Sequence, residues 1–214
     1  MLYDKDIREP LFDFLEETYG KIRIIEEKRI GKTRADVMMV TPDSIWGIEI
    51  KSDADTYARL ERQVKDYNRI FDYNCVAVGS SHGHHVAEHI PDYWGIITID
   101  ETDDGADFYV YRQPQPNPKR EKQVKFRNQV SLLWRPELAH IQELNGMHKY
   151  AQKSKVWVVE KIMDTVEPEL LKKQVCDELF ERDYNKIAET INEYRKSQGR
   201  RKKRTSKKGR KVHL

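Results

Sequence analysis

Three segments near the start of the chain carry apolar patterns typical of β-strands, and the third alternates clearly. They span residues 21–30, 34–40 and 45–51, and two short turns separate them, one around Gly31 and one around Pro42. Turns this short join neighbouring antiparallel strands. The pattern therefore predicts a three-stranded antiparallel meander.

Apolar residues at helical spacing predict a helix on either side of this meander. The first helix begins at a capping box around Asp6 and ends at Gly20. The second carries an apolar stripe formed by Tyr57, Leu60, Val64, Tyr67 and Phe71. The elements expected after it are a buried parallel strand (75–79), a short helix (84–90), another strand (94–99) and an edge strand (108–112).

The second half of the chain carries helical rather than strand patterns. Apolar residues recur at helical spacing in residues 127–134, 136–144, 153–164 and 169–182, after the Pro-rich segment Q-P-Q-P-N-P-K. We therefore expect an α/β fold. Its parts are a core at residues 1–112, a linker at 113–122, an α-helical extension at 123–194 and a disordered basic tail at 195–214.

Charge is distributed unevenly along the chain, and this changes the expected partners. The net charge is +3, but the segment from Arg195 to Leu214 contains 11 Lys or Arg and no acidic residue. The remaining residues, with 28 basic and 36 acidic side chains, have a net charge of −8. A basic tail favours nucleic acid as its partner, because Lys and Arg release the counterions condensed on phosphates. The alternative is a tail that only keeps the protein in solution.

The sequence lacks the features of membrane, secreted and zinc-finger proteins. No apolar run approaches the ~20 residues that cross a bilayer. The N-terminal segment M-L-Y-D-K-D-I-R-E lacks the apolar core of a signal peptide. Neither Cys75 nor Cys176 has a partner at metal-ligand spacing. We therefore expect a cytoplasmic protein with no membrane partner and no zinc finger.

The candidate chemistry lies on the strand W-G-I-E-I-K-S, where Glu49 and Lys51 point to the same face. A four-residue loop before this strand would place Asp36 directly opposite Glu49, with Cβ atoms ~5 Å apart. Two ionised carboxylates at that distance repel each other, and a divalent cation such as Mg2+ relieves the repulsion. The backbone carbonyl of Ile50 offers a further oxygen ligand. Lys51 is placed to orient a water molecule or to neutralise charge on a phosphoryl group.

The pattern R-A-D, followed after 12 residues by E-I-K, resembles the core motif of the PD-(D/E)xK nuclease superfamily. The matching residues are Asp36, Glu49 and Lys51, and Ala35 stands where the name-giving proline would be. The stretches E-I-K-S-D-A-D-T, R-L-E-R-Q and L-L-W-R-P-E-L extend the resemblance to a bacterial and phage-borne branch, over residues 4–182. The resemblance implies a restriction-endonuclease-like core: a helix, a three-stranded antiparallel meander, a helix and a parallel strand.

The same resemblance implies residues that support the motif. Gln63 and Tyr67 match a Q-x-x-x-Y pattern on the following helix, in which the Gln lies over the active centre. Tyr67 would contact DNA, or would alternatively pack in the core as part of the apolar stripe. Arg34 lies two residues before Asp36 and either binds a phosphate or neutralises the carboxylates.

A further carboxylate is expected near the motif. The resemblance favours Glu27 over its neighbour Glu26, and Glu16 and Glu17 on the first helix are weaker candidates. In the tail, the residues expected to contact backbone phosphates are Arg200, Arg201, Lys202, Lys203 and Arg204.

These observations predict a Mg2+- or Mn2+-dependent deoxyribonuclease, an endonuclease rather than an exonuclease, in the cytoplasm of a bacterial or phage-infected cell. Its expected partner is DNA, with RNA as an open alternative, and double-strand cutting would imply a homodimer. The alternative function is a non-catalytic nucleic-acid-binding module of the same fold. In that case Glu49 pairs with Lys51 or Arg34 only to fix the strand register.

A cluster of histidines follows the strand at 75–79 and comprises His82, His84, His85 and His89. His85 and His89 have the spacing of two zinc ligands on one helix face. We interpret the cluster as an exposed loop rather than a zinc site, because no thiol or carboxylate constellation is evident nearby. Contact between one of these histidines and a phosphate is a further alternative.

Overall fold

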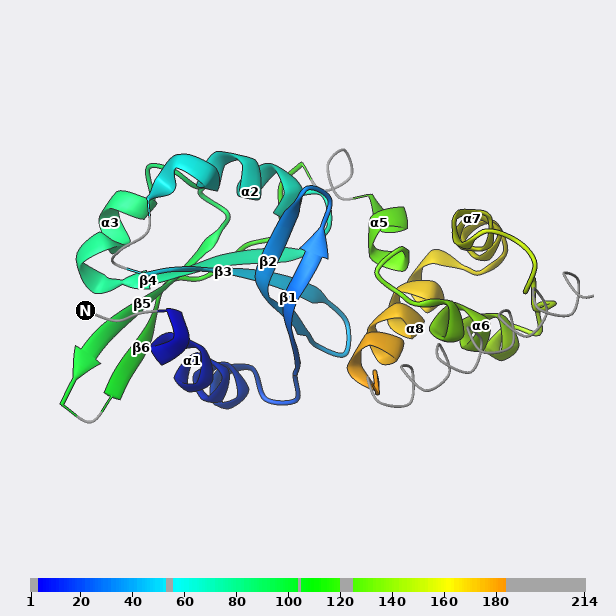
Figure 1. Ribbon diagram of the computed structural model, residues 1–214, viewed down its shortest axis with the longest axis horizontal. Coiled ribbons are helices and arrows are strands. Elements are labelled where there is room, and N and C mark those ends of the chain that lie inside the picture. Colours follow the sequence, from blue (N-terminus) through cyan, green and yellow to red (C-terminus); the bar gives the residue numbers. More distant parts are fainter. Residues whose placement is uncertain (1–3, 53–55, 104, 120–124, 184–214) are drawn as a thin grey trace, which may run out of the picture.

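The computed structural model describes residues 4–52, 56–103, 105–119 and 125–183 (Figure 1). The protein has an α/β fold built on one mixed six-stranded sheet. The predicted basic tail, with Arg200, Arg201, Lys202, Lys203 and Arg204, lies outside the described residues, as does part of the predicted linker.

The strands lie in the sheet in the same order as in the chain. They are β1 (Arg23–Ile30), β2 (Thr33–Val40), β3 (Ile45–Lys51), β4 (Tyr73–Gly79), β5 (Gly95–Thr102) and β6 (Gly105–Arg112). The first three form the expected antiparallel meander, β3, β4 and β5 are parallel, and β6 returns antiparallel to β5. Strand β4 and the first five residues of β5 are buried almost throughout, as expected for central strands with helices on both faces of the sheet.

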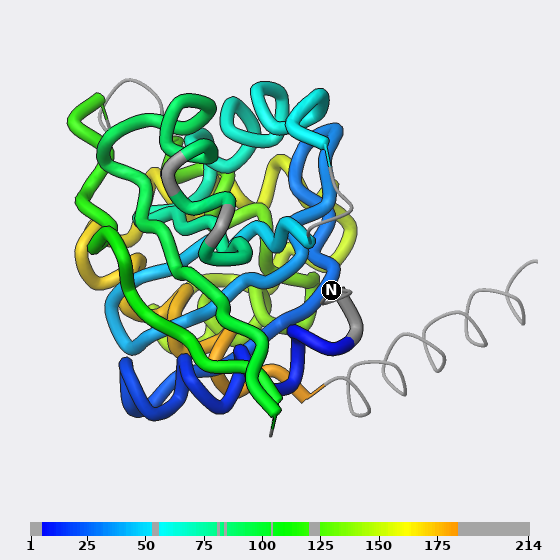
Figure 2. The backbone as a smooth tube through the Cα atoms, turned by 90° about the vertical axis from the view of Figure 1, so that its left-hand side faces the viewer, coloured from blue at the N-terminus to red at the C-terminus, as the bar shows by residue number. Residues whose placement is uncertain are grey.

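Helices occupy both sides of the sheet. Those of the first half are α1 (Asp4–Tyr19), the short 3-10 helices η1 (Tyr57–Arg59) and η2 (Ser80–His82), α2 (Leu60–Tyr67) and α3 (Gly83–Val86). Figure 2 shows α1 on one face of the sheet and α2 with α3 on the other. The second half contains α5 (Phe126–Val130), α6 (Arg135–Leu144), α7 (Lys155–Thr165) and α8 (Pro168–Phe180). None of the helices in the described ranges is long and apolar enough to cross a bilayer.

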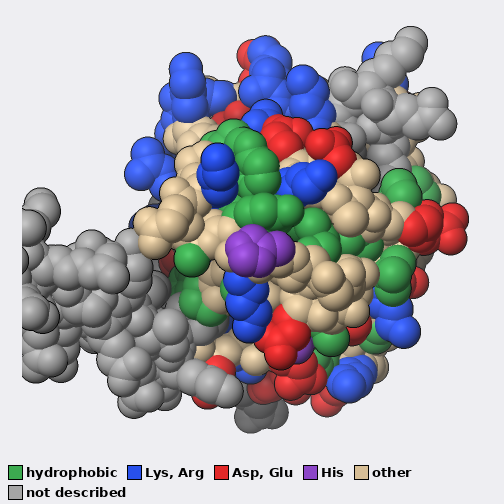
Figure 3. Space-filling model, turned by 90° about the vertical axis from the view of Figure 1, so that its right-hand side faces the viewer, with side chains coloured by type: hydrophobic (Ala, Val, Ile, Leu, Met, Phe, Trp, Pro, Cys, Tyr) green, Lys and Arg blue, Asp and Glu red, His purple; other side chains and the backbone are tan. Residues whose placement is uncertain are grey.

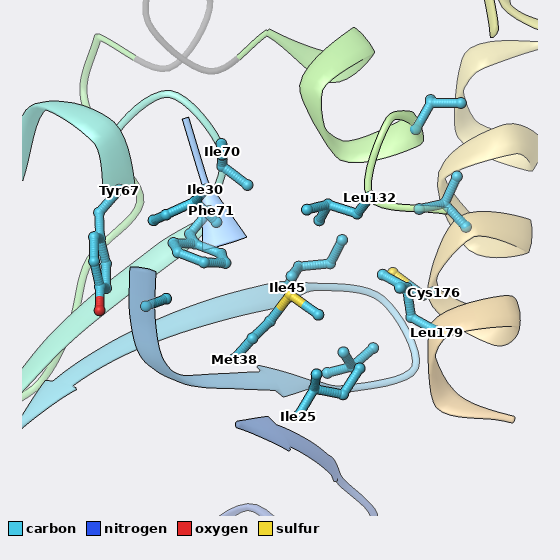
Figure 4. Packing of buried hydrophobic residues seen from close by; sticks show 14 of the residues in the cluster. Ile25, Ile30, Met38, Ile45, Tyr67, Ile70, Phe71, Leu132, Cys176 and Leu179 are labelled. Atoms are coloured by element: carbon cyan, nitrogen blue, oxygen red, sulfur yellow. The ribbon is translucent and has the colours of Figure 1, made fainter. Parts of the chain in front are cut away.

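Two hydrophobic clusters follow from the strand alternation. On one face Ile48 and Ile50 of β3 pack with Leu11 and Leu15 of α1. On the other face the cluster runs without interruption from the sheet and α2 into α5–α8 (Figure 4). Glu49 and Lys51 of β3 point to this second face, because successive side chains of a strand alternate. The single strand β3 therefore supplies a core on one side and charged groups on the other.

Buried polar contacts attach the α-helical extension to the sheet. Asp72, just before β4, accepts hydrogen bonds from the backbone amide of Ile45 at 2.9 Å and from the Lys172 ammonium of α8 at 2.5 Å. After α8, the Arg182 carbonyl accepts a hydrogen bond from Arg23 of β1 at 3.0 Å. Seen from the helical end, Lys and Arg side chains gather along one edge and hydrophobic side chains lie near the middle (Figure 3). The extension is thus continuous with the core through both apolar and polar contacts.

The predicted elements match the observed ones closely in the sheet and less closely in the helices. The strand at 45–51 has the predicted bounds, and the strand at 34–40 begins one residue earlier. The helix expected across Tyr57–Phe71 is instead η1 followed by α2, which ends at Tyr67. The helix expected at 127–134 ends at Val130. Cys75 and Cys176 are both buried, unpaired thiols.

Candidate functional site

A polar cleft of about 350 Å³ opens at the start of β2 and the end of β3, next to η1 and α2. Its walls combine the acidic pair, the lysine of β3 and several basic side chains. The lining residues are Arg8, Glu27, Lys32, Thr33, Arg34, Asp36, Glu49, Ile50, Lys51, Arg59, Arg62 and Gln63. The structure thus brings together Asp36, Glu49, Lys51, Gln63, Glu27, Arg34 and Ile50, which are the predicted site residues of the core other than Tyr67.

Glu49 is the buried centre of a hydrogen-bond network. Its side chain is only 1% exposed. Oε1 accepts hydrogen bonds from the Lys51 ammonium at 2.7 Å and from the Gln63 amide, and Oε2 accepts one from the Tyr67 hydroxyl at 2.7 Å. The Lys51 ammonium also donates to the Gln63 side-chain oxygen at 3.2 Å. These contacts hold the Glu49 carboxylate in a single orientation and balance its charge within a buried site.

Asp36 is the second carboxyl group of the cleft. Its Oδ2 accepts a hydrogen bond from the Ile50 backbone amide at 2.9 Å, and its Oδ1 lies 4.0 Å from the Arg8 guanidinium. Burial, followed by the charge of Glu49, raises the pKa of Asp36 to about 7, against the opposing effects of the Ile50 amide, Lys51 and Arg8. The site therefore contains a carboxyl group that changes charge near neutral pH.

The predicted pairing of Asp36 with Glu49 needs a correction. The ladder between β2 and β3 has the predicted register, but it runs only from Val40–Ile45 to Val37–Ile48. Beyond this point the strands no longer pair, and the Asp36 carboxylate reaches the Ile50 amide instead of lying in a ladder position opposite Glu49. The strands separate here, and the cleft opens between them.

An irregularity in β1 lies at the same level of the sheet. Glu27 has a φ of 54°, in the left-handed region, and neither Glu27 nor Asp36 takes part in the β1–β2 ladder. A non-glycine residue in this region is strained unless its surroundings hold it there. Two arginines supply that support: Arg8 donates to Glu27 at 2.7 Å, and Arg34 forms an ion pair with the same carboxylate.

The choice between the two neighbouring glutamates is resolved by position. Glu27 lines the cleft, whereas Glu26 is half exposed, lies outside the set of cleft residues and contacts Arg8 at 3.4 Å. Glu16 and Glu17, the weaker candidates on α1, are exposed and lie outside the set of cleft residues. The Glu27 carboxylate contacts the Arg8 and Arg34 guanidinium groups at the cleft wall.

The prediction that Tyr67 contacts DNA is wrong. The side chain is fully buried in the core, and its hydroxyl accepts a hydrogen bond from the Asp36 amide at 3.3 Å while donating to Glu49. Burial, together with the charges of Glu49 and Asp36, raises the pKa of Tyr67 well above its ordinary value, so the hydroxyl stays protonated as a donor. Tyr67 thus positions Glu49 from below the cleft.

Arg34 lies at the cleft wall near the start of β2. It pairs with Arg29 of β1 in the ladder, and its side chain is 67% exposed beside Glu27. Its guanidinium partly neutralises Glu27 and also presents N–H groups at the cleft wall. Its position is therefore compatible both with neutralising the carboxylates and with binding a phosphate.

Sequence reasoning missed four basic residues of the cleft. They are Arg8 of α1, Lys32 of the β1–β2 turn, Arg59 of η1 and Arg62 of α2. Arg59 lies four residues before Gln63, which places the two side chains on one helix face. Helical spacing from the predicted Gln63 would therefore have pointed to Arg59. Arg8 gave no comparable signal, because its contact with Glu27 joins residues 19 positions apart.

The donor set of the cleft fits a hard cation such as Mg2+ or Mn2+. All candidate ligands are oxygens, the class that these cations prefer. Each carboxylate oxygen has two lone pairs, so Glu49 Oε2 and Asp36 Oδ1 keep acceptor capacity beyond their described contacts. The Ile50 carbonyl points to the same strand edge as its amide, which faces Asp36. A cation would also relieve the repulsion that raises the pKa of Asp36.

The histidine cluster contains a carboxylate that the sequence analysis overlooked. Ligand atoms of His85, Glu88 and His89 lie within 4.8 Å of one another, the one such group of three among the described residues. All three side chains are exposed. His82 belongs to η2 and is not part of this group, and the His84 side chain lies outside the description.

Comparisons with known proteins give one structural neighbour and one family. The structure of SfsA from Pyrococcus furiosus in complex with Ca2+ is similar to this chain with a TM-score of 0.33 and 14% identity. The match covers 52% of this chain and 64% of that one. No curated protein matches the chain. Residues 1–206 match a family model almost from end to end, so the chain belongs to the phage protein family described as Bacteriophage P4 protein cII.

Proposed function

We propose that this protein is a metal-dependent nuclease that hydrolyses DNA phosphodiester bonds, an endonuclease related to the PD-(D/E)xK superfamily with a restriction-endonuclease-like core. The observation that carries the proposal is the meeting of Asp36, Glu49 and Lys51 in one basic-walled cleft. The motif residues come from separate strands, yet they share a cavity large enough for a hydrated cation and a phosphate. The order of α1, the meander, α2 and β4 matches the expected core.

In this proposal the acidic pair binds the cation, and the lysine acts on the water or the phosphate. A bound Mg2+ or Mn2+ would supply Lewis-acid polarisation of the phosphate and lower the pKa of water. Asp36 and Glu49, with the Ile50 carbonyl, would hold that cation. An ammonium has three N–H donors, and among the described contacts Lys51 gives two to Glu49 and Gln63. The third would orient the attacking water or stabilise charge that grows on a phosphoryl oxygen.

The surrounding side chains support this chemistry at two levels. Gln63 and Tyr67 fix the orientation of Glu49, while Glu27 holds the Arg8 and Arg34 guanidinium groups at the cleft wall. The basic lining attracts the phosphate backbone without reading base sequence. The tail would add affinity of the same non-specific kind. We place this activity in the cytoplasm of a phage-infected bacterial cell, and concerted cutting of both strands would favour a homodimer.

The test is a cleavage assay with the full-length protein on supercoiled, linear and single-stranded DNA, each with Mg2+, Mn2+ or EDTA. We expect nicking or linearisation of supercoiled DNA with either cation and no cleavage in EDTA. Cleavage of linear DNA only from its ends would correct the proposal to an exonuclease. Absence of cleavage of all three substrates with both cations would refute it.

A second candidate function is a non-catalytic nucleic-acid-binding module. The observation that favours it is the completeness of the network around Glu49, which is buried and pairs with Lys51, Gln63 and Tyr67 without any cation. Such a protein would bind DNA with an affinity independent of Mg2+. Filter binding in EDTA, combined with the cleavage assay, separates the two functions.

A further inference from the structure

We propose that His85, Glu88 and His89 form a second metal site, separate from the cleft, that binds one late first-row divalent cation of the Zn2+ type. None of these residues belongs to the described lining of the cleft. The site follows β4 and comprises the end of α3 and the turn after it.

The backbone places the three side chains on one face. The amide of Glu88 donates to the His85 carbonyl at 3.2 Å, and the amide of His89 donates to the Val86 carbonyl at 3.0 Å. The chain therefore continues as a helical turn beyond Val86, and residues at i, i+3 and i+4 lie beside one another on such a turn. The sequence order H-V-A-E-H produces this arrangement directly.

The side-chain distances are close to those of a coordinated cation. His85 Nδ1 lies 3.6 Å from Glu88 Oε2, and the ligand atoms of all three residues lie within 4.8 Å. Two atoms bound at ~2.0–2.1 Å to one tetrahedral Zn2+ are ~3.4 Å apart. Small rotations of the three side chains would bring their ligand atoms to this spacing, because all three are exposed.

The donor types select the class of metal. Two imidazole nitrogens and one carboxylate oxygen suit Zn2+, Co2+, Ni2+ or Cu2+, whereas Mg2+ prefers oxygen alone. Three protein ligands also leave at least one coordination position for water or another exchangeable group. The two metal sites of the chain would thus differ in the cations they take, Mg2+ or Mn2+ in the cleft and a Zn2+-type ion here.

A neighbouring aromatic side chain orients one ligand. Tyr57 stacks on the His89 ring with centroids 4.5 Å apart at 27°, and it also contacts the His85 ring at 5.9 Å. Support of this kind holds a ligating ring in place, as outer partners do in known metal sites. Tyr57 begins η1, which leads into α2 and Gln63, so the bound cation would also attach the turn after β4 to the helix that covers the cleft.

The test is Zn2+ titration by calorimetry on the untagged full-length chain after treatment with EDTA, repeated with Co2+ while its ligand-field absorption is recorded. We expect one equivalent to bind and the Co2+ spectrum to indicate nitrogen and oxygen ligands. His85→Ala and His89→Ala should each lose this binding, and the isosteric Glu88→Gln should weaken it. Because all three side chains are exposed, these variants should melt at the wild-type temperature in EDTA.

Two controls make the result specific. His140→Ala removes another exposed histidine that pairs with a carboxylate, Glu178, at 2.5 Å, and it should bind Zn2+ as the wild type does. Asp36→Asn changes the cleft and should also leave this binding unchanged. Wild-type protein that binds no Zn2+, or His85→Ala and His89→Ala variants that bind it normally, would overturn the proposal.

Discussion

At the scale of single residues, the balance of charge at Asp36 is the most informative feature. The carboxyl group is partly buried beside Glu49, and the Arg8 guanidinium lies 4.0 Å away. The ionised form of Asp36 is therefore destabilised when no metal is bound. Binding of a cation at this site would relieve the repulsion between the two carboxylates. A pair of carboxylates with a purely structural role would gain nothing from such repulsion.

This charge balance predicts a pH-dependent stability. Because the folded-state pKa of Asp36 is about 7, above its ordinary value of 3.8, the folded state binds the proton more tightly than the unfolded state. The contribution of Asp36 to the unfolding free energy therefore falls as pH rises from about 4 to 7. Asp36→Asn removes this loss, so urea denaturation without metal should find the variant more stable than wild type at pH 8, by roughly 4 kcal/mol at most.

The same measurement has an internal control. At pH 5 the difference between wild type and Asp36→Asn should shrink, because the native carboxyl is then protonated as well. Adding Mg2+ at pH 8 should stabilise the wild type and leave the variant unchanged. A difference that does not vary between pH 5 and pH 8 would show that the Asp36 carboxyl titrates normally.

Residue-level prediction from sequence was most accurate where the signal was local or carried by the motif. Glu49 and Lys51 share a strand face, as strand alternation predicts. Asp36 lies in the same cleft, although the predicted ladder ends before it reaches this residue. Gln63 came from the resemblance. The left-handed backbone at Glu27 has no signature in the alternation pattern, and Arg8 joins the cleft only through tertiary packing of α1.

At the scale of elements, the close approach of α2 to β3 sets the position of Gln63 and Tyr67. Gly47 of β3 makes this approach feasible, since a Cβ at this position would collide with the rings of Phe71 and Tyr67. Strand β3 therefore needs a residue without a side chain at the place where the helix crosses it. The bounds of α2 reflect the same packing, because the chain turns after Tyr67 to place Phe71 against Gly47.

We predict that Gly47→Ala destabilises the protein by about 3 kcal/mol, because the added methyl group must displace two buried aromatic rings. Urea denaturation monitored by circular dichroism would measure this change. Cleavage should fall as well, since α2 carries Gln63 and Tyr67 to Glu49. Wild-type stability of Gly47→Ala would mean that the helix is not in tight contact with β3.

The observed ends of the helices and strands differ from the predicted ends where tertiary contacts, rather than the local sequence pattern, determine them. The strands were predicted well because short turns and alternation fix them locally. The helix expected at 127–134 ends early because Trp134 begins the next helix, where its amide donates to Glu137 at 2.5 Å. Apolar spacing continues across this break, so spacing alone could not locate it.

At the scale of the whole molecule, the sequence predicted the α/β class and the order of the elements, but not how the two halves join. The apolar stripes of α5–α8 are compatible with a separate helical unit. In the structure they share one hydrophobic cluster with β2, β3 and α2. Contacts such as Lys172 with Asp72, a hundred residues apart, have no local signature.

The charge distribution of the whole molecule gives a test of the proposed DNA binding. The segment from Arg195 to Leu214 provides 11 of the 39 Lys and Arg residues. Removing it should weaken DNA binding and reduce the slope of log K against log salt, because fewer counterions are released. Fluorescence anisotropy across a range of salt concentrations would measure both effects. A tail of equal length with Gln in place of Lys and Arg is the matched control, and an unaltered slope would assign the tail no part in binding.

The central claim is that Asp36 and Glu49 hold a catalytic cation in the cleft. The most direct measurement is the initial rate of Mg2+-dependent cleavage of supercoiled DNA by wild type, Asp36→Asn and Glu49→Gln, with His140→Ala as a folded control. We predict that both cleft variants lose activity by about a hundredfold or more while His140→Ala keeps the wild-type rate. Equal rates for wild type and both cleft variants would contradict the account.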